Sequence, residues 1–385
     1  MTVIIAGGGI GGLSLALALA RRGLESTVIE AAPAIEAVGA GLQLGPNATS
    51  VLAGWGLADA LAERAVEPVQ AVVRDARTGA VLVRSRFGQD ARARWGAPYL
   101  GLTRAALQSL LLEAAQASGL VRLRLGARIA SVRSEALAAV AVLEGGVELE
   151  GEVLFGCDGL RSQVQAAVFG RRAPRYTGQT VWRGLAALPT DAPAEVQVWT
   201  APRRHFVRYP VSRGLVNMVA VVEAPAAALE SWTEVGQGGE LAAAFAGWPE
   251  SVRAAIAAVE RPWRSALYDR APLARWSHGR ISLLGDAAHP MLPFLAQGAA
   301  MAIEDAEVAA SLLAGGGDRA AALRAYEGAR LSRTAKVQAW SRRNAVLFHL
   351  PSPVATGVFG AAKRLDQVRG VEGEARFDWL YGWTP

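Results

Sequence analysis

Cysteine and lysine are scarce in this chain of 385 residues, which contains one cysteine, Cys157, and two lysines, Lys336 and Lys363. A single cysteine excludes an intramolecular disulfide and favours a reducing compartment. Arginine carries nearly all of the positive charge and no basic run is present, so the net charge of +6 does not indicate a nucleic-acid-binding arm. A mildly positive field still favours anionic substrates and a phosphorylated cofactor.

Long apolar runs are also missing. No stretch reaches the length that a membrane span needs, and the apolar N-terminus lacks the basic segment of a signal peptide. Hydrophobic residues make up 52% of the chain and charged residues 19%, which excludes a disordered protein. We therefore expect a cytoplasmic globular enzyme, monomer or homodimer, with two domains or one domain with an insertion, and no nucleic-acid, membrane or metal partner.

Hydrophobic periodicity predicts a βαβ unit at the start of the chain. Residues 2–6 and 26–30 have the pattern of buried strands, and residues 13–22 that of a helix ending at Gly23. Further elements are expected in this order: a helix at 46–54, hairpin strands at 69–75 and 81–86, a helix from the N-cap Thr103 to residue 116, strands within 121–143 and 175–223, a strand at 281–284, and helices at 296–313 and 319–348. This order predicts an α/β fold with a strand-rich insertion.

The turn between the first strand and the first helix is rich in glycine. Residues 7–12, Gly-Gly-Gly-Ile-Gly-Gly, fit the G-x-G-x-x-G fingerprint. Gly7 permits a tight turn, Gly9 lets the backbone approach a pyrophosphate, and Gly12 allows close packing of the helix. Glu30 ends the next strand, where a carboxylate can hold a ribose hydroxyl. The pattern predicts a dinucleotide site and does not distinguish FAD from NAD.

Two further motifs follow apolar strands. Residues 156–162 read Gly-Cys-Asp-Gly-Leu-Arg-Ser, and residues 285–290 read Gly-Asp-Ala-Ala-His-Pro. Each motif places an aspartate, Asp158 or Asp286, at the carboxyl end of a strand, which is the edge where α/β sheets bind ligands. Either motif alone is also compatible with an ordinary turn or helix cap.

The three motifs in this order resemble the class A flavoprotein monooxygenases, the group of para-hydroxybenzoate hydroxylase and salicylate hydroxylase. The resemblance implies an α/β fold in which a Rossmann-like FAD-binding domain carries an inserted β-rich substrate domain and ends in long C-terminal helices. The FAD-binding domain is expected at residues 1–65, 99–170 and 264–385, and the substrate domain at residues 66–98 and 171–263. The family binds one FAD and uses NADH or NADPH without a separate domain for that nucleotide.

The resemblance also assigns residues to the cofactor. Those implied to surround FAD are Gly7, Gly9, Gly12, Glu30, Gly41, Arg104, Asp158, Gly159, Asp286, Pro293, Gln297, Gly298 and Ala299. Arg104 is implied to reach the phosphates and Asp286 the ribityl chain, while the hairpin at 39–47 and the loop at 293–299 flank the isoalloxazine ring. His289 is expected to be structural, because it belongs to the motif around Asp286.

The residues that hold the nicotinamide nucleotide are less defined. The resemblance links Asp158 and Gly159 to the reduced nucleotide as well as to FAD. The family often has an arginine at the end of this motif, where this chain has Gln165. The choice between NADH and NADPH therefore stays open.

The implied reaction is hydroxylation of a small aromatic compound, similar to a hydroxybenzoate or a hydroxypyridine carboxylate, by a flavin hydroperoxide. The protein must exclude water, position the ring and accept the phenolic proton. The pattern His-x-x-x-Tyr-Pro from His205 to Pro210 resembles the subgroup of 3-hydroxybenzoate 6-hydroxylase and 6-hydroxynicotinate 3-monooxygenase. Gln43 and Pro293 are also expected to contact the substrate, although the 6-hydroxynicotinate enzymes carry a histidine at the first position and the 3-hydroxybenzoate enzymes a glutamine at the second.

Both residues of this pattern are expected on one strand. A spacing of four places His205 and Tyr209 on the same face, ~13 Å apart along an ideal strand. We expect His205 to accept the phenolic proton, directly or through water, and Tyr209 to position the ring. The alternative is that His205 caps a surface strand and Tyr209 packs within the sheet.

Three other functions fit the same motifs. Flavin halogenases carry a Trp-x-Trp-x-Ile-Pro motif and a catalytic lysine, whereas this chain has no such motif and both its lysines follow Asp305. A flavin-dependent reductase of isoprenoid-type substrates and a non-catalytic flavin-binding protein remain as alternatives.

Overall fold

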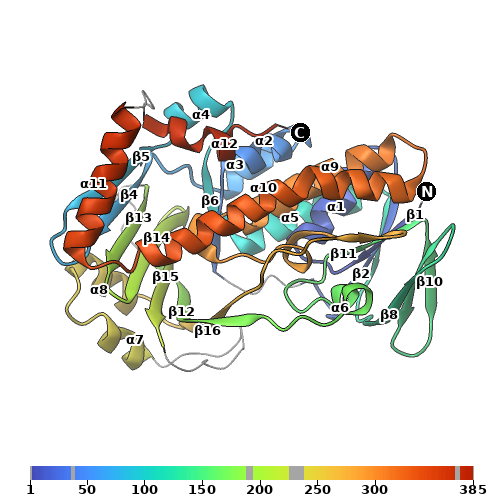
Figure 1. Cartoon of the computed structure of the whole chain (residues 1–385), viewed down its shortest axis with the longest axis horizontal. Coiled ribbons are helices and arrows are strands. Elements are labelled where there is room, and N and C mark those ends of the chain that lie inside the picture. Colours follow the sequence, from blue (N-terminus) through green and yellow to red (C-terminus); the bar gives the residue numbers. More distant parts are fainter. Residues whose placement is uncertain (1, 36–39, 188–193, 225–237, 369–372, 385) are drawn as a thin grey trace.

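The computed structural model describes residues 2–35, 40–187, 194–224, 238–368 and 373–384 (Figure 1). Gly39, the first residue of the expected hairpin, lies outside these ranges. Two large sheets dominate the described chain, and they lie toward opposite ends of the view in Figure 1. Among the described residues, no helix combines the length and apolar character that crossing a membrane requires.

The first sheet has six strands in the order β17-β18-β11-β1-β2-β7. Its members are β1 (Thr2–Ala6), β2 (Glu25–Ile29), β7 (Val121–Arg124), β11 (Val153–Gly156), β17 (Ser277–His278) and β18 (Ile281–Leu283). All neighbours pair in parallel except β17, which is antiparallel at one edge. Because β1 and β11 are central and covered on both faces, their residues are almost entirely apolar and buried.

Helices cover one face of this sheet. They are α1 (Ile10–Ala20), α5 (Arg104–Ala117), α9 (Gly298–Ala314) and α10 (Arg319–Leu347). Helix α1 packs between α5 and α9, and it is apolar around its whole circumference because it is buried on all sides. A smaller sheet of β8 (Ile129–Ser134), β9 (Ala139–Leu143) and β10 (Glu148–Gly151) contacts β1 and β11, and α6 (Gln163–Phe169) packs on β8.

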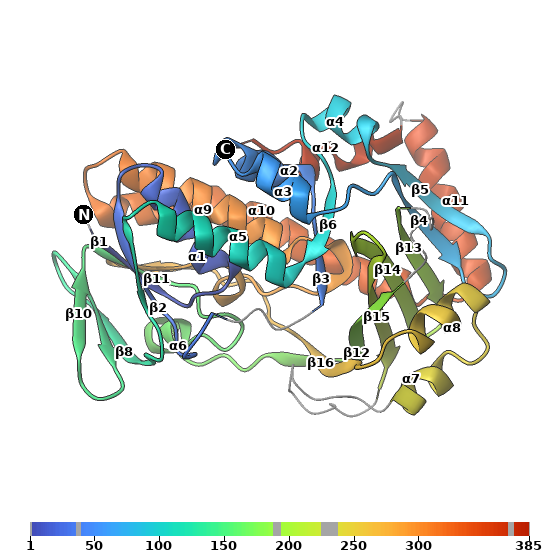
Figure 2. The ribbon, with the colours of Figure 1, turned by 180° about the vertical axis from the view of Figure 1, so that it is seen from behind.

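The second sheet has seven strands in the order β16-β12-β15-β14-β13-β4-β5. They are β4 (Gln70–Asp75), β5 (Val81–Arg86), β12 (Arg175–Ala187), β13 (Glu195–Ala201), β14 (Arg204–Ser212), β15 (Leu215–Glu223) and β16 (Trp263–Asp269). Figure 2 shows α7 (Gly238–Ala244) and α8 (Glu250–Ala257) beside this sheet, away from the first one. Phe206 and Met218 pack against Phe245 and the neighbouring residues of these two helices.

The opposite face of the second sheet packs against η2 (Pro293–Leu295) and the C-terminal half of α10. Alternating side chains thus divide this sheet into two apolar faces, as expected where both sides are covered. Helix α10 runs from the first sheet to the second and links the two regions (Figure 1). Helix α11 (Ser352–Val368), η3 (Gly373–Phe377) and α12 (Asp378–Tyr381) follow, and the first two contact β5.

The remaining elements lie between the two large sheets or at their edges. They are the two-stranded sheet of β3 (Gly41–Leu44) and β6 (Leu100–Thr103), the helices α2 (Pro46–Gly54), α3 (Ala58–Arg64) and α4 (Gln89–Trp95), and η1 (Gly285–Ala287). Strand β6 packs on β14, and a Cβ atom added to Gly101 would lie 2.2 Å from the carbonyl oxygen of Pro210. Glycine at this position therefore allows β6 to pack closely against β14 of the second sheet.

Most elements predicted from the sequence are present, including the N-cap at Thr103, whose Oγ accepts a hydrogen bond from the N–H of Ala106 at 3.1 Å. Two predicted helix starts were wrong, and α1 also ends at Ala20, two residues before the predicted end. Helix α1 begins at Ile10, not at residue 13, because packing against β1 overrides the poor helix propensity of its glycines. Helix α9 begins at Gly298, since Ala296 has a left-handed φ of 53° that interrupts the chain after η2. The division into two domains stays a prediction.

Candidate active site

The glycine turn lies at the carboxyl end of β1 and is sterically closed on one side. A Cβ atom on Gly12 would approach the carbonyl oxygen of Gly7 to 1.9 Å, whereas one on Gly9 would meet no atom within 4 Å. The turn is therefore tightly packed where Gly12 meets Gly7, and it has open space beside Gly9. No side chain caps the first N–H groups of α1, which leaves them available to phosphate oxygens.

Side chains from two other elements hold this turn. The Glu30 carboxylate accepts hydrogen bonds from the N–H of Gly8 at 2.7 Å and of Ala32 at 2.9 Å. Gln108, on α5, donates from Nε2 to the carbonyl oxygen of Gly8 at 3.1 Å, a contact that the sequence did not predict. Glu30 thus lies beside the turn as expected, and its contact with a ribose stays a prediction.

Asp158 is fixed by the start of α6. Its carboxylate accepts hydrogen bonds from the hydroxyl of Ser162 and from the N–H groups of Gln163 at 2.7 Å and Val164 at 3.1 Å. Burial raises the pKa of Asp158, and these hydrogen bonds oppose the rise. Gln165 is buried and donates to the carbonyl oxygen of Gly170 at 2.9 Å.

The turn at Asp286 is held by a buried ionic cluster. His289 Nε2 lies 2.5 Å from Asp305 Oδ2, and the second oxygen of Asp305 accepts a hydrogen bond from Arg330 Nε at 2.7 Å. Although burial acts in the opposite direction, the charges of His289 and Arg330 lower the pKa of Asp305. Asp305 also accepts from the N–H of Gly285 at 3.2 Å. These contacts fit the structural role expected for His289, while Asp286 itself is exposed.

The loop before α9 contains unsatisfied buried polar atoms. Gln297 Oε1 accepts a hydrogen bond from Asn47 Nδ2 at 3.0 Å. Within the described ranges, Gln297 Nε2 and Asn47 Oδ1 are buried and have no hydrogen-bond partner. Buried polar groups are rarely left unpaired, so a polar ring edge of a bound cofactor fits here. The first N–H groups of α9 have no side-chain cap either.

Strand β3 connects the cofactor region to the second sheet. The expected hairpin at 39–47 was wrong, because β3 pairs with the distant strand β6 and is followed directly by helix α2. Asn217 Oδ1 accepts a hydrogen bond from the N–H of Gly41 at 2.7 Å, and Gln43 Oε1 accepts one from the Tyr99 hydroxyl at 2.9 Å. A Cβ atom on Gly41 would lie 2.4 Å from Val211 and 3.0 Å from the ring of Tyr209. Strand β3 thus packs closely against the end of β14 that carries Tyr209.

One face of the second sheet presents three rows of side chains toward η2. The pairing of β12, β15 and β14 aligns Val181, Val221 and His205 in one row, Arg183, Val219 and Val207 in the next, and Leu185, Asn217 and Tyr209 in the third. His205 and Tyr209 therefore share a face, as their spacing predicted. His205 and Tyr209 are buried, but the whole middle row is only half-buried. Space for solvent-sized molecules thus lies over the middle row, between the two.

Charge in this region is positive. Burial lowers the pKa of Arg183 to about 10, with the nearby charge of Arg104 acting in the same direction and Tyr209 opposing it. Burial raises the pKa of Tyr209, against the effects of Arg183 and of hydrogen bonding to Asn217 and Gln43. Tyr209 is thus protonated at neutral pH and can donate a hydrogen bond. The sequence did not single out Arg183 or Asn217.

His205 is enclosed by aromatic rings. Its side chain is fully buried, and the rings of Phe294 and Phe348 lie 4.9 Å and 5.3 Å from its own. Its Nδ1 is 2.8 Å from Nε2 of His349, a residue that the sequence analysis did not consider. The alternative that His205 caps a surface strand is therefore wrong, because no part of this ring reaches solvent.

Known proteins share this architecture. A family model described as FAD binding domain matches residues 1–341. The chain belongs to this family. The 3-amino-4-hydroxybenzoate 2-monooxygenase PtnB3 of Streptomyces platensis is 40% identical, with 99% of this chain and 96% of the relative covered. The 3-hydroxybenzoate 6-hydroxylase 1 of Aquipseudomonas alcaligenes is 36% identical, with 99% and 97% covered. HpxO of Klebsiella pneumoniae, solved with FAD and uric acid, has a TM-score of 0.86 at 28% identity, with 99% and 97% covered.

These comparisons confirm the predicted resemblance to the flavoprotein monooxygenases, and with it the prediction of an FAD-binding enzyme of the monooxygenase class. In this FAD-binding protein the three motifs converge at the carboxyl edge of the first sheet. Gly7 is so close to the second motif that a Cβ atom there would lie 2.6 Å from the carbonyl oxygen of Cys157. The open turn at Gly9, the uncapped helices and the orphaned atoms of Asn47 and Gln297 all fit FAD. The role of each single residue stays a prediction.

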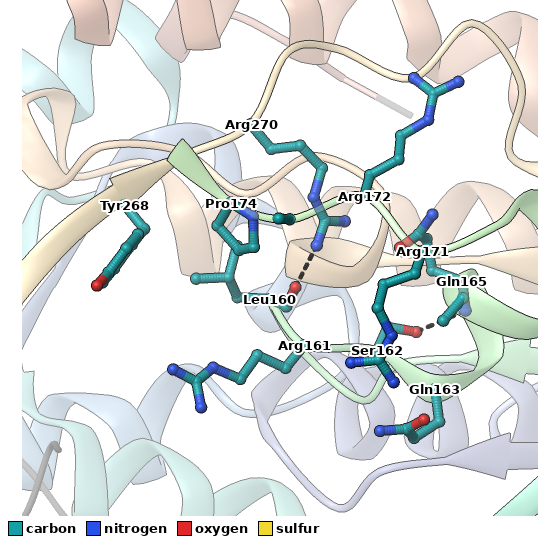
Figure 3. A pocket seen from close by; sticks show the side chains of 12 residues that line it. Leu160, Arg161, Ser162, Gln163, Gln165, Arg171, Arg172, Pro174, Tyr268 and Arg270 are labelled. Carbon is teal, nitrogen blue, oxygen red and sulfur yellow. Dashed lines mark hydrogen bonds between the residues drawn. The ribbon is translucent and has the colours of Figure 1, made fainter. Parts of the chain in front are cut away.

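An arginine-lined cavity of about 420 Å³ lies beside the second motif (Figure 3). Its basic lining residues are Arg161, Arg171, Arg172 and Arg270, and Tyr268 lines it as well. Arg270 donates to the carbonyl oxygen of Leu160. Burial lowers the pKa of Arg270, with Arg172 acting in the same direction and Asp286 opposing it. Asp286 therefore lies close to this cavity, which adjoins two of the three cofactor motifs.

Proposed function

We propose that the protein hydroxylates a small aromatic acid that carries a phenolic hydroxyl group, with FAD as its cofactor and NADH or NADPH as the reductant. The observation that carries this proposal is the sheet face on which His205, Arg183 and Tyr209 surround two half-buried valines of the middle row, Val207 and Val219. The two valines offer an apolar surface for a ring, and the three other side chains offer a base, a cation and a hydrogen-bond donor. Such a combination suits an aromatic ring with two polar substituents.

The substrate class follows from the charge of this face. The two relatives described above act, by their names, on 3-amino-4-hydroxybenzoate and 3-hydroxybenzoate, which both combine a carboxylate with a phenol. Arg183 supplies a guanidinium group in the middle row, and Arg104 adds a second positive charge nearby. Guanidinium groups bind carboxylates through paired, charge-assisted hydrogen bonds. A hydroxybenzoate or a hydroxypyridine carboxylate therefore fits this site.

Each residue has a role in the reaction. Bound FAD, once reduced, supplies the activation of dioxygen. His205 Nε2 accepts the phenolic proton, which raises the electron density of the ring at the carbon to be hydroxylated. Phe294, Val207 and Val219 exclude water, and the hydroxyl group of Tyr209 positions the substrate. Gln43 orients Tyr209 through the contact between them.

The arginine-lined cavity is our candidate for the reduced nucleotide. A nicotinamide dinucleotide carries a pyrophosphate and, in NADPH, a further phosphate, and arginine clusters bind such groups. Gln165 lines this cavity and donates to the carbonyl oxygen of Gly170, and Arg161, Arg171 and Arg172 around it supply the positive charge that the arginine of the family would supply at this position. Oligomeric state and the lack of a nucleic-acid partner stay predictions.

The test is turnover by the purified FAD-loaded protein. Oxidation of NADH and of NADPH and the uptake of oxygen are measured with 3-hydroxybenzoate, 3-amino-4-hydroxybenzoate and 6-hydroxynicotinate. Benzoate, which lacks the phenol, and urate serve as controls. We expect a phenolic acid to stimulate oxidation and to gain one oxygen atom from labelled dioxygen. Bound flavin without turnover of any phenolic acid contradicts the proposal and favours the non-catalytic flavoprotein, and reduction of an isoprenoid favours the reductase.

A further inference from the structure

Three side chains form a continuous line from one face of the second sheet to the C-terminal end of β15. His205 Nδ1, on β14, lies 2.8 Å from His349 Nε2, and His349 Nδ1 lies 2.9 Å from Glu223 Oε1, on β15. His205 is fully buried and the His349 side chain is 5% exposed, whereas the Glu223 side chain is 36% exposed. The line therefore joins a ring without solvent contact to a carboxylate that water reaches.

The carboxylate fixes the direction of every hydrogen bond in this line. A carboxylate only accepts, so His349 donates from Nδ1 to Glu223 and its Nε2 carries a lone pair. His205 must then donate from Nδ1 to that lone pair. The remaining nitrogen, His205 Nε2, is left with a lone pair, and within the described ranges it is buried without a hydrogen-bond partner. The line thus ends, on its inner side, in an unsatisfied base.

The electrostatic surroundings keep both rings neutral at rest. Burial lowers the pKa of His205 well below its ordinary value, and the neighbouring His349 acts in the same direction. Burial also lowers the pKa of His349, although Glu223 opposes the change. The other charged group at this end is Arg203, whose Nε donates to Glu223 at 3.1 Å from the surface. A neutral His205 can accept a proton, but a lasting positive charge among Phe294 and Phe348 would be costly.

We propose that His205, His349 and Glu223 form a proton relay that carries the phenolic proton from the substrate to solvent. This inference rests on the proposed function, since it requires a phenol at the site. The proton of the phenol binds His205 Nε2, the Nδ1 proton of His205 moves to His349 Nε2, and the Nδ1 proton of His349 moves to Glu223 Oε1. Each ring gains one proton and loses one, so the only charges that change are those of the substrate and Glu223. The reverse sequence returns a proton to the hydroxylated product.

The position of His349 supports a transient charge at the centre of the relay. His349 directly follows Phe348, the C-cap of the 29-residue helix α10. The C-terminus of a helix carries partial negative charge, which favours an imidazolium ion there. A transient positive charge in the relay is therefore better stabilised on His349, which lies beside Glu223 and a helix end, than on His205.

Variants of the FAD-loaded protein test the relay in the absence of reductant. A phenolic acid is mixed with the oxidised protein in a stopped-flow instrument, and phenolate absorbance and proton release to an indicator dye are followed across pH. His349→Gln and Glu223→Gln keep a polar side chain but interrupt the transfer. His278→Gln is the matched control, because His278 is an exposed residue on β17 in the first sheet.

We expect both relay variants to slow phenolate formation and proton release by about tenfold or more, as general-base contributions of this size are usual. FAD content and the Kd of the phenolic acid should change less than twofold in these variants, and the control should behave as wild type. Imidazole added to His349→Ala should restore part of the rate, which a purely structural role would not permit. Wild-type rates in both relay variants, in a protein that still hydroxylates the acid, overturn the relay alone. A wild-type protein that binds no phenolic acid overturns the proposed function and the relay with it.

Discussion

Replacing Arg183 by methionine isolates the contribution of one charge to substrate binding. The side chain lies in the half-buried middle row, near Tyr209 and Arg104, and its NH1 donates to Ser265 Oγ at 3.1 Å. A hydrogen bond that involves a charged group contributes about 1.5–3 kcal/mol, and about 1.4 kcal/mol corresponds to a factor of ten in affinity. If Arg183 binds the carboxylate, Arg183→Met should therefore raise the Kd of the acid about tenfold to 150-fold. Methionine keeps most of the apolar stem, so the packing of the row is largely retained.

The assay is a titration of the flavin absorbance with 3-hydroxybenzoate and, in parallel, with 3-hydroxybenzamide. The amide has the same ring and phenol but no charge, so its Kd should change little in the variant. Ser265→Ala is the matched control, because it removes the other end of the Ser265 hydrogen bond and leaves the charge in place. Equal weakening of acid and amide in Arg183→Met would refute the reasoning, since the effect would then come from packing and not from the carboxylate.

Four further variants test the other parts of the site. His205→Ala should retain FAD and nucleotide oxidation but release hydrogen peroxide in place of hydroxylated product, and tightly coupled hydroxylation by this variant would contradict its role as the base. Asp286→Ala should weaken FAD binding by about tenfold or more, because the ribityl hydroxyls lose a charged acceptor; unchanged flavin affinity by fluorescence titration excludes this contact. Glu30→Ala should also weaken FAD binding, since the N–H groups of Gly8 and Ala32 lose their acceptor, while the Kd of the aromatic acid stays unchanged. Arg171→Gln combined with Arg172→Gln should raise the KM of the reduced nucleotide about tenfold, and an unaltered KM would remove the cavity as its binding site.

The cofactor region could be predicted from the sequence because its determinants are local. The glycine turn, Asp158 and Asp286 each lie within a few residues of the strand that positions them, and parallel strands bring their carboxyl ends to a common edge. Gly12 has to be glycine, because any side chain there would meet the carbonyl oxygen of Gly7, and this requirement appears in the sequence as a glycine motif. For the same reason the family could be recognised from three short segments.

The substrate face could be predicted only in part. The spacing within β14 placed His205 and Tyr209 on one face, but sequence alone does not say which face is buried or which residues of β12 and β15 stand beside them. Arg183 and Asn217 lie on this face because of how β12, β15 and β14 pair. His349 contacts His205 although the two residues are 144 positions apart in the sequence. A histidine at a helix end gives no local sign of such a contact.

The charges of the site act on the phenol in one direction. A positive charge near a phenol favours its ionised form, so under the proposed function the charges of Arg183 and Arg104 would lower the free energy of the phenolate, and Arg183 would also bind the carboxylate. Burial favours the neutral form of His205, and the proposed line through His349 to Glu223 would lead the proton away from Arg183 and Arg104. If the proton stayed on His205, the buried imidazolium and the two arginines would repel one another across the same sheet face. With the arginines at the middle row and the proposed proton exit at the end of β15, this repulsion would be avoided, which fits a base and a carboxylate anchor in different rows of the sheet.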